Sequence, residues 1–487
     1  MATRLVRRKR KRRRSWAEPA APAASRRDSL TAGLKKRPRL AALALAIALA
    51  SGTATVASLN ANGSGYATAE GGAIQAALVG ESADLAGFYE ARRYEPVWVE
   101  RGKLRPEAKA LISTIAAAGQ DGLDPERYGL SALKTAHAAA QTGEHPALAR
   151  FEVQASRAFA AYVNDLHTPA PGAEMIYTDP AAAPSRLTAA SILTAAGGAR
   201  SLGDHLKAVR RMNPVYEGLR RDLALYRANA GGDARERLIL LNMERARAMP
   251  ANPGPRFIMV DAAAATLWLY ENGRPVDSMK VVVGKQNEQT PFMAGVIRYA
   301  LFNPYWNVPE DMIRDQIGPQ VLRAGPAVLA SRDLEALSDW SPQARIVDPA
   351  TVDWSAVASG AQYLRVRQRP GPTNMMGDVK FMLPNELGIY LHDTPNKALF
   401  ARDDRFFSSG CVRLEDAPRL ARWLFGEVPD PATPEHRVDL KAPVPVYFTY
   451  LTAAPSPAGI TFRPDVYRRD AAALALLSNR APIRAAA

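Results

Sequence analysis

The stretch RFIMVDAAAATLWLYENG, residues 256–273, decides how this chain is organised. Residues 256–261 and 266–271 are short runs rich in residues that favour strands. They are followed by Asn272-Gly273, the dipeptide most typical of a two-residue β-hairpin turn. We therefore expect a β-domain to begin at this point of the chain.

Further strand-like runs continue toward the C-terminus, at residues 279–283, 297–302, 363–369, 379–383, 388–392 and 446–451. Several short strands with few helices between them predict an antiparallel sheet, a sandwich or an open barrel. Residues 309–362 break this pattern with helical spacing and several prolines. A long insertion in a compact domain is usually functional, so we expect an inserted lid there, within a β-domain spanning 255–452.

The region before this domain has a different periodicity. Residues 83–250 are rich in Ala, Leu and Arg, and apolar side chains recur about every 3.6 residues, most clearly at 105–118, 147–166 and 214–227. This pattern predicts an all-α domain that ends at the Pro- and Gly-rich stretch 249–255. We expect residues 62–82, which are small and polar, to form a linker, and residues 453–487 to form a tail.

The positive charge of the chain is concentrated at the N-terminus. Residues 1–40 hold fifteen Lys or Arg and two acids, so they carry +13 of the net +15. The apolar run 40–50 and a stretch of small residues follow, which is the order of a secretory signal within 1–61. We expect export, with the segment either cleaved or kept as a membrane anchor. The alternative is a basic nucleic-acid-binding arm, but the nearly neutral remainder of the chain gives no such signal.

The chemistry is concentrated around the only cysteine, Cys411. One cysteine excludes a disulfide framework and a thiolate zinc cluster. The following residues look like the start of a helix ending at Gly426, so we expect its dipole to lower the pKa of the thiol. The flanking Arg405 and Arg413 favour the thiolate as well. A small buried cysteine without chemistry is the alternative.

Two further features complete a set of groups suited to acyl transfer. His392 ends a predicted strand and is placed to act as a general base. Gly410 permits a tight turn, so the backbone N–H groups of Gly410 and Cys411 are candidates for an oxyanion hole. No metal or organic cofactor is required for thioester chemistry, and the other histidines show no ligand spacing.

His392-Asp393-Thr394 and Ser408-Ser409-Gly410-Cys411-Val412-Arg413 together resemble the signature of L,D-transpeptidases with a YkuD-type catalytic domain. Most of that family has a histidine at the position of Ser409. The serine here is similar to the large periplasmic subgroup, in which Ser-Ser-Gly-Cys is usual. Further matching segments are Val283-Gly284-Lys285, Thr290-Pro291, Asn303–Pro309, Gly371–Phe381, Phe88–Trp98 and Gly122–Tyr128. We find no peptidoglycan-binding repeat between the two halves, so docking of glycan strands by such a module is not expected.

The resemblance implies an α+β protein, with an N-terminal helical scaffold domain followed by a mostly antiparallel β sandwich carrying the inserted helical lid. It implies a periplasmic enzyme that forms 3→3 cross-links between peptidoglycan stem peptides through a thioester on Cys411, activated by His392. Carbapenems are expected to acylate the same sulfur. The protein is expected to contact the inner membrane only through its N-terminal segment. Substrate contacts are implied for Arg413, Ser409, Tyr390 and Trp306.

The residues leave three points open. Asp393 either orients His392 or caps the end of its strand, and Arg405 alternatively pairs with Asp403 or Asp404. Water as the acceptor would make the same site an L,D-carboxypeptidase or endopeptidase. A non-catalytic wall-binding scaffold is the alternative from a different class of protein.

Overall fold

The computed structural model describes residues 69–229 and 231–477. The predicted export segment, residues 1–61, lies outside the described residues. Within the described residues, no helix combines the length and the apolar character that crossing a membrane requires.

The N-terminal part of the described chain is helical, as the apolar spacing predicts. Its helices are α1 (Ala69–Ala77), α2 (Ala83–Ala91), α3 (Pro106–Ala116), α4 (Leu130–Ala140), α5 (His145–His167), α6 (Ala189–Gly197), α7 (Leu202–Ala208), α8 (Pro214–Asn229) and α9 (Ala234–Arg247). Helix α5 lies at the centre, because it packs against α1, α3, α4 and α6. Two expectations fail here. Residues 69–77 belong to a helix and not to a linker, and the short hairpin of β1 (Val99–Glu100) and β2 (Lys103–Leu104) means that the region is not purely α-helical.

The C-terminal part is built on one large sheet. Its strands are β4 (Arg256–Asp261), β5 (Thr266–Glu271), β6 (Arg274–Gly284), β7 (Met293–Phe302), β12 (Val379–Met382), β13 (Leu391–His392), β14 (Phe406–Ser408), β15 (Val412–Leu414) and β16 (His436–Thr449). Their order is β12-β13-β15-β6-β5-β4-β16-β7, and β12 also pairs with β7, so the sheet curls around an apolar interior. Most neighbours are antiparallel, but β13–β15, β4–β16 and the side pair β14–β6 run parallel. The predicted α+β organisation is confirmed.

Residues 256–273 form the two strands and the turn that their sequence predicts. Asn272 and Gly273 both have positive φ, 49° and 76°, which is the geometry of a type I′ turn. Alternate side chains of β4 point to opposite faces. Ile258 and Val260 join the interior of the sheet, whereas Phe257 and Met259 pack against the helical region. This second buried face joins the two halves of the molecule.

Two more connections tie the halves together. The short strand β3 (Ile176–Tyr177), from the helical region, pairs with β7 of the large sheet. After β16, the chain returns to the helices as β17 (Ala453–Ser456), β18 (Gly459–Phe462) and α15 (Asp470–Leu477). Both α8 and α9 contact this segment. Residues 453–477 are therefore folded, and the expectation of a tail is wrong for them.

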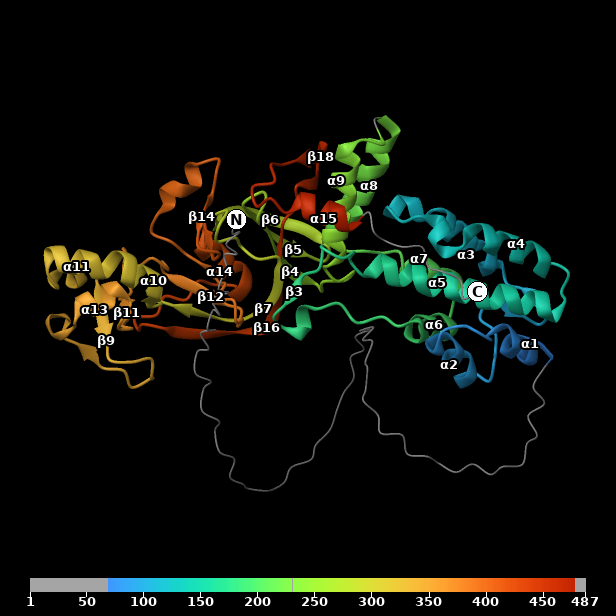
Figure 1. Ribbon diagram of the computed structural model, residues 1–487, viewed down its shortest axis with the longest axis horizontal. Helices are drawn as coiled ribbons and strands as arrows, with labels where there is room; N and C mark the ends of the chain where they lie inside the picture. Colours follow the sequence, from blue (N-terminus) through green and yellow to red (C-terminus); the bar gives the residue numbers. More distant parts are fainter. Residues whose placement is uncertain (1–68, 230, 478–487) are drawn as a thin grey trace, which may run out of the picture.

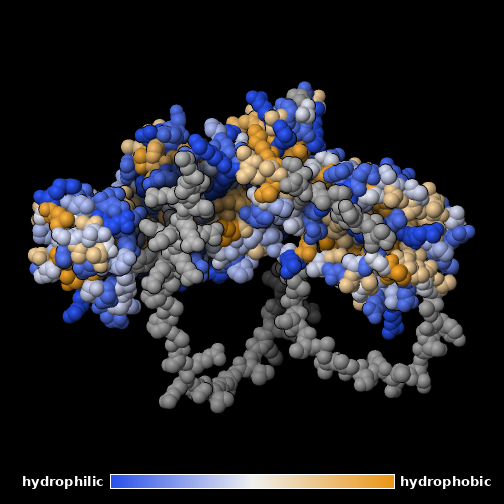
Figure 2. Space-filling view, in the orientation of Figure 1, coloured by the Kyte–Doolittle hydropathy of each residue, from blue (hydrophilic) through white to orange (hydrophobic). Residues whose placement is uncertain are grey.

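The insertion has a core of its own. Helices α10 (Glu310–Met312), α11 (Gly318–Ala324), α12 (Ala327–Ala330) and α13 (Trp354–Ser359) pack with a sheet of β8 (Trp306–Asn307), β9 (Leu334–Leu337), β10 (Ile346–Val347) and β11 (Arg365–Gln368). It forms one end of an elongated molecule, with the large sheet in the middle and the helices α1–α7 at the other end (Figure 1). Figure 2 shows mostly hydrophilic residues over the insertion and a gathering of apolar ones near α15.

Candidate functional site

His392 ends strand β13, and Cys411 immediately precedes the neighbouring strand β15. Strand β13 pairs with β15 in parallel, with Leu391 opposite Val412 and His392 opposite Arg413. Leu391 and Val412 point into the apolar interior. Since side chains alternate along a strand, His392, Arg413 and Cys411 share the other face.

Positive charge surrounds this face. Lys380 of β12 lies opposite His392 in register, and its ammonium group sits 3.7 Å from the centre of the Tyr390 ring. The charges of Lys380 and Arg413 both lower the pKa of Cys411 and of His392. The structure thus brings together four of the residues expected from the sequence: Cys411, His392, Arg413 and Tyr390. It adds the positive charge of Lys380, a residue to which the sequence had assigned no role at the site.

The sulfur of Cys411 is held as a thiol. Its side chain is half-buried, and its Sγ donates to the carbonyl of Gly388 at 3.3 Å. Burial is the largest influence and raises the pKa of Cys411, although a backbone hydrogen bond from Tyr390 lowers it. The predicted lowering by a helix dipole is wrong, because strand β15 separates Cys411 from α14 (Ala417–Phe425), the helix that begins after it.

His392 is buried and its tautomer is fixed by its neighbour. Its Nδ1 lies 2.6 Å from the backbone carbonyl of Asp393, which can only accept a hydrogen bond. Nδ1 therefore carries the proton, and Nε2 has the lone pair that a general base requires. Burial first, and then the charge of Arg413, lower the pKa of His392 to about 4. The imidazole is thus neutral near pH 7.

Asp393 makes its hydrogen bond to His392 through its backbone carbonyl, whereas its carboxylate influences His392 only through its charge. The carboxylate pairs with Lys397 at 2.6 Å and accepts from the N–H of Asp378 at 3.1 Å. These contacts fix the loop beside β13. The two roles expected for Asp393 are therefore divided between its carbonyl, which orients His392, and its side chain, which secures the loop.

The turn before Cys411 is held by a serine that sequence reasoning did not single out. Ser408 is buried, and its Oγ both donates to the carbonyl of Cys411 and accepts from the N–H of Gly410 at 3.2 Å. That N–H is used within the turn, so this geometry does not support the oxyanion role expected for Gly410. Cys411 N–H stays the candidate. Gly410 has φ +113°, and a Cβ on it would lie 3.0 Å from Ile389. A glycine is therefore required here.

Arg405 occupies a different place from the one expected, whereas Trp306 and Ser409 remain candidates for substrate contact. Arg405 is buried and donates to backbone carbonyls, including those of Arg402 (2.8 Å) and Ala265 (3.1 Å), so it fixes loops. Its contact with Asp403 is to the carbonyl, and Asp404 pairs with Arg402 instead. Trp306 packs against the core of the insertion, the ordinary role of an aromatic on a strand. Ser409 is exposed beside the turn.

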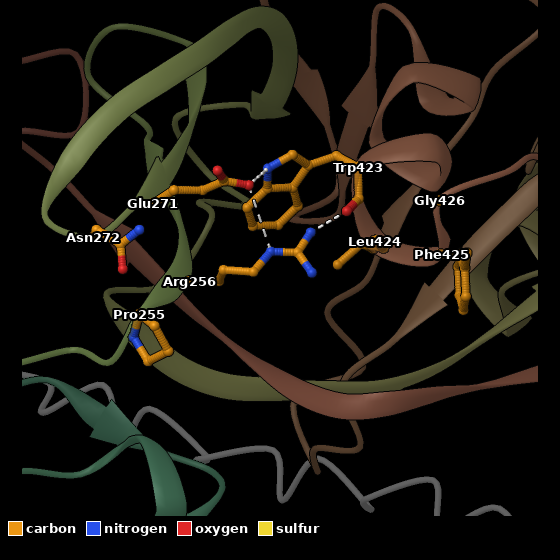
Figure 3. Close-up of a pocket in the computed structure, with 8 residues that line it drawn as sticks. All are labelled: Pro255, Arg256, Glu271, Asn272, Trp423, Leu424, Phe425 and Gly426. Carbon is orange, nitrogen blue, oxygen red and sulfur yellow. Dashed lines mark hydrogen bonds and ion pairs between the residues drawn. The ribbon is translucent and has the colours of Figure 1, made fainter. Parts of the chain in front are cut away.

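A cavity of about 550 Å³ lies at the C-terminal end of α14, the end farther along the chain from Cys411. Figure 3 shows the residues that line it. It is lined by Pro255, Arg256, Glu271, Asn272, Trp423, Leu424, Phe425 and Gly426. The Trp423 indole donates to Glu271 at 2.9 Å, and the Arg256 guanidinium lies 4.0 Å from the centre of a Trp423 ring. None of the residues that line this cavity belongs to the sheet face that carries Cys411 and His392.

Comparison with known proteins agrees with this geometry. Residues 255–446 match the YkuD family, described as the L,D-transpeptidase catalytic domain, and residues 83–223 match the family described as the Scaffold domain. A Haemophilus influenzae protein named "Putative L,D-transpeptidase" is 30% identical over 276 residues, which are 55% of this chain and 55% of that protein. The chain thus spans about half the length of this relative.

Among solved structures, an L,D-transpeptidase from Mycobacterium smegmatis is 14% identical, with 40% of this chain and 58% of that chain covered. The TM-score is 0.17, so this superposition contributes nothing to the fold assignment, which rests on the strand order and the family matches.

Proposed function

Because the chain belongs to the YkuD family of L,D-transpeptidases, with a scaffold domain before its catalytic domain, we propose that it forms 3→3 cross-links between peptidoglycan stem peptides. The reaction would pass through a thioester on Cys411, outside the inner membrane. The observation that carries the proposal is the arrangement on one sheet face. A reachable thiol and a neutral histidine with a deprotonated Nε2 share that face with two cationic side chains.

The arrangement supports a balanced sequence of steps. The Cys411 proton moves to His392 Nε2 while sulfur attacks the carbonyl carbon of the third residue of a tetrapeptide stem. The C–N bond to the terminal D-alanine then breaks, and the leaving amine takes the proton from His392. The amine of a second stem attacks the thioester and loses a proton to His392, and the departing sulfur takes this proton from His392, which restores the thiol and the neutral imidazole. We expect Sγ and Nε2 to lie within about 4 Å in this state.

The cationic groups have a separate role. Arg413 is half-buried, and its planar guanidinium is suited to a two-pronged contact with a stem carboxylate. Lys380 and Arg413 also stabilise negative charge on sulfur as it leaves in the second step. The N–H of Cys411 is the candidate donor to the oxyanion, an interaction worth about 3 kcal/mol in a comparable hydrolase.

Two measurements test the proposal. Intact-protein mass spectrometry after exposure to a carbapenem should show one adduct on the wild-type chain and none on Cys411→Ala. Incubation with purified tetrapeptide muropeptides should then give cross-linked dimers. Trimmed monomers alone would assign the site to hydrolysis, and no adduct and no product would contradict acyl transfer at Cys411.

A further inference from the structure

Residues 463–470 lie beyond both family matches, which end at residues 223 and 446. They nevertheless contact the loop 284–290, which is hydrogen-bonded to the turn before Cys411. Tyr467 is 3% exposed, and its hydroxyl donates to the carbonyl of Gly284 at 2.7 Å. The same hydroxyl accepts from the N–H of Thr290 at 3.4 Å. Tyr467 thus joins the two ends of the loop 284–290.

This loop in turn holds the nucleophile turn. Thr290 is fully buried, and its Oγ1 accepts from Gly284 N–H at 2.9 Å and donates to the carbonyl of Gly410 at 2.8 Å. A Cβ on Gly284 would lie 2.2 Å from the carbonyl of Glu288, so the loop is closed tightly upon itself. Thr290 therefore connects Tyr467 to Gly410, the residue preceding Cys411. Its N–H contacts the Tyr467 hydroxyl, and its own hydroxyl contacts the Gly410 carbonyl.

Arg469 makes a parallel set of contacts. Its Nε donates to Gln289 Oε1 at 2.8 Å, and its Nη2 donates to the carbonyl of Thr290 at 3.1 Å. Its guanidinium also lies over the Tyr467 ring, 5.0 Å from the centre. The Asp465 carboxylate accepts from the backbone N–H of Arg469 at 2.9 Å and fixes the turn from which both side chains project.

We infer that Tyr467 and Arg469 are positioning residues for Cys411, acting through Thr290 and the carbonyl of Gly410. The inference rests on the proposed function, because the property that it concerns is the placement of the nucleophile. It assigns a part in the reaction to a segment outside the YkuD match.

The inference predicts opposite changes in two reactions of the same sulfur. Tyr467→Phe leaves the Gly284 carbonyl and the Thr290 N–H without this partner, so the loop and the Gly410 turn loosen. Sulfur then becomes more accessible to water, and the pKa of Cys411 falls toward its ordinary value. A small alkylating reagent should react faster, whereas turnover of a stem peptide, which needs sulfur in one position, should become slower.

The experiment uses the full chain, in which Cys411 is the only cysteine and iodoacetamide labelling is therefore site-specific. For Tyr467→Phe, we expect labelling at pH 7 to rise about threefold, with a lower pH midpoint. Its kcat for tetrapeptide cleavage should fall about fivefold, with KM little changed. The matched control is Tyr447→Phe, a buried tyrosine packed toward the helices, which should leave both rates unchanged.

A labelling midpoint and a kcat equal to those of the wild type in Tyr467→Phe would overturn the inference. A purely structural role would lower the melting temperature without moving the midpoint of the folded protein. Should Tyr467→Phe not fold, Arg469→Met decides the question, because it removes the contacts with Gln289 and with the Thr290 carbonyl and leaves Tyr467 in place. If the wild type does not turn over stem peptides, the proposed function fails, and the labelling comparison still decides the positioning role.

Discussion

The ionisable side chains on the Cys411 face influence one another through their charges. Arg413 lowers the pKa of both Cys411 and His392, and burial keeps the first a thiol and the second a neutral imidazole. Both protonation states suit a mechanism in which the proton moves only as the substrate is attacked. A preformed thiolate and imidazolium pair is not what these surroundings favour.

Replacing Arg413 by methionine tests this electrostatic coupling. Loss of the positive charge should raise the pKa of both groups, so alkylation of Cys411 at pH 7 should fall about threefold. In the wild type, kcat/KM should decline only as the pH falls through about 4, where His392 becomes protonated and can no longer act as a base. In Arg413→Met this decline should begin at a higher pH.

The control for that substitution is Arg419→Met, which removes a partly exposed arginine of α14. It should leave the thiol titration and the acidic decline unchanged. If Arg413→Met left both titrations unchanged as well, the charge of Arg413 would not reach the site.

The bounds of strands and helices are predicted best where a clear apolar pattern in the sequence coincides with burial in the structure. Strands β4 and β5 begin and end at the predicted residues, because their runs are strongly apolar and a turn sequence stops the second. Helix α1 was missed, since AEGGAIQAA has no strong apolar stripe and contains two glycines. The predicted influence of Arg405 on the thiol was wrong for a different reason. Nearness in sequence does not show that the side chain turns away, toward the carbonyls of Ala264 and Ala265.

Helix α5 contains the buried acid that organises the scaffold domain. Glu152 is fully buried and accepts hydrogen bonds from Val97 N–H (2.6 Å), Trp98 N–H (2.8 Å) and the Tyr89 hydroxyl (2.7 Å). It therefore secures the chain before β1 against α5. The apolar spacing of α5 predicted the helix but not this polar residue on its buried face.

Glu152→Gln should lower the free energy of unfolding by about 2 kcal/mol at pH 5, because an amide N–H₂ then faces backbone donors. Burial raises the pKa of Glu152 to about 7, so the wild type loses stability as the pH rises from the ordinary carboxyl range through 7. The variant lacks this titration, and its deficit should narrow over that range. Urea unfolding at several pH values measures this, with exposed Glu144→Gln as the control. A deficit independent of pH would contradict the raised pKa.

At the scale of the whole molecule, the segment after β16 joins the helical half to the site. Thr452 and Asn242 of α9 exchange two hydrogen bonds of 3.0 Å. Next to them, Arg245 of α9 pairs with Asp470 of α15 at 2.8 Å, and both residues are buried. Asp470 is adjacent to Arg469, which contacts the loop beneath Cys411. The helical half and the nucleophile turn are therefore linked through one short stretch of chain.

Asp470→Ala tests how strongly this link stabilises the molecule. It leaves the guanidinium of Arg245 buried without its carboxylate, which should cost about 3–5 kcal/mol of unfolding free energy. The control is Asp439→Ala, which breaks the exposed pair with Arg437 (2.6 Å) and should cost no more than about 1 kcal/mol. Guanidinium unfolding followed by tryptophan fluorescence measures both. Because Trp98 reports on the helices and Trp268 on the sheet, separate substitution of each to Phe shows which half loses stability. Equal costs for the two Asp variants would mean that the buried Arg245–Asp470 pair stabilises the molecule no more than an exposed ion pair does.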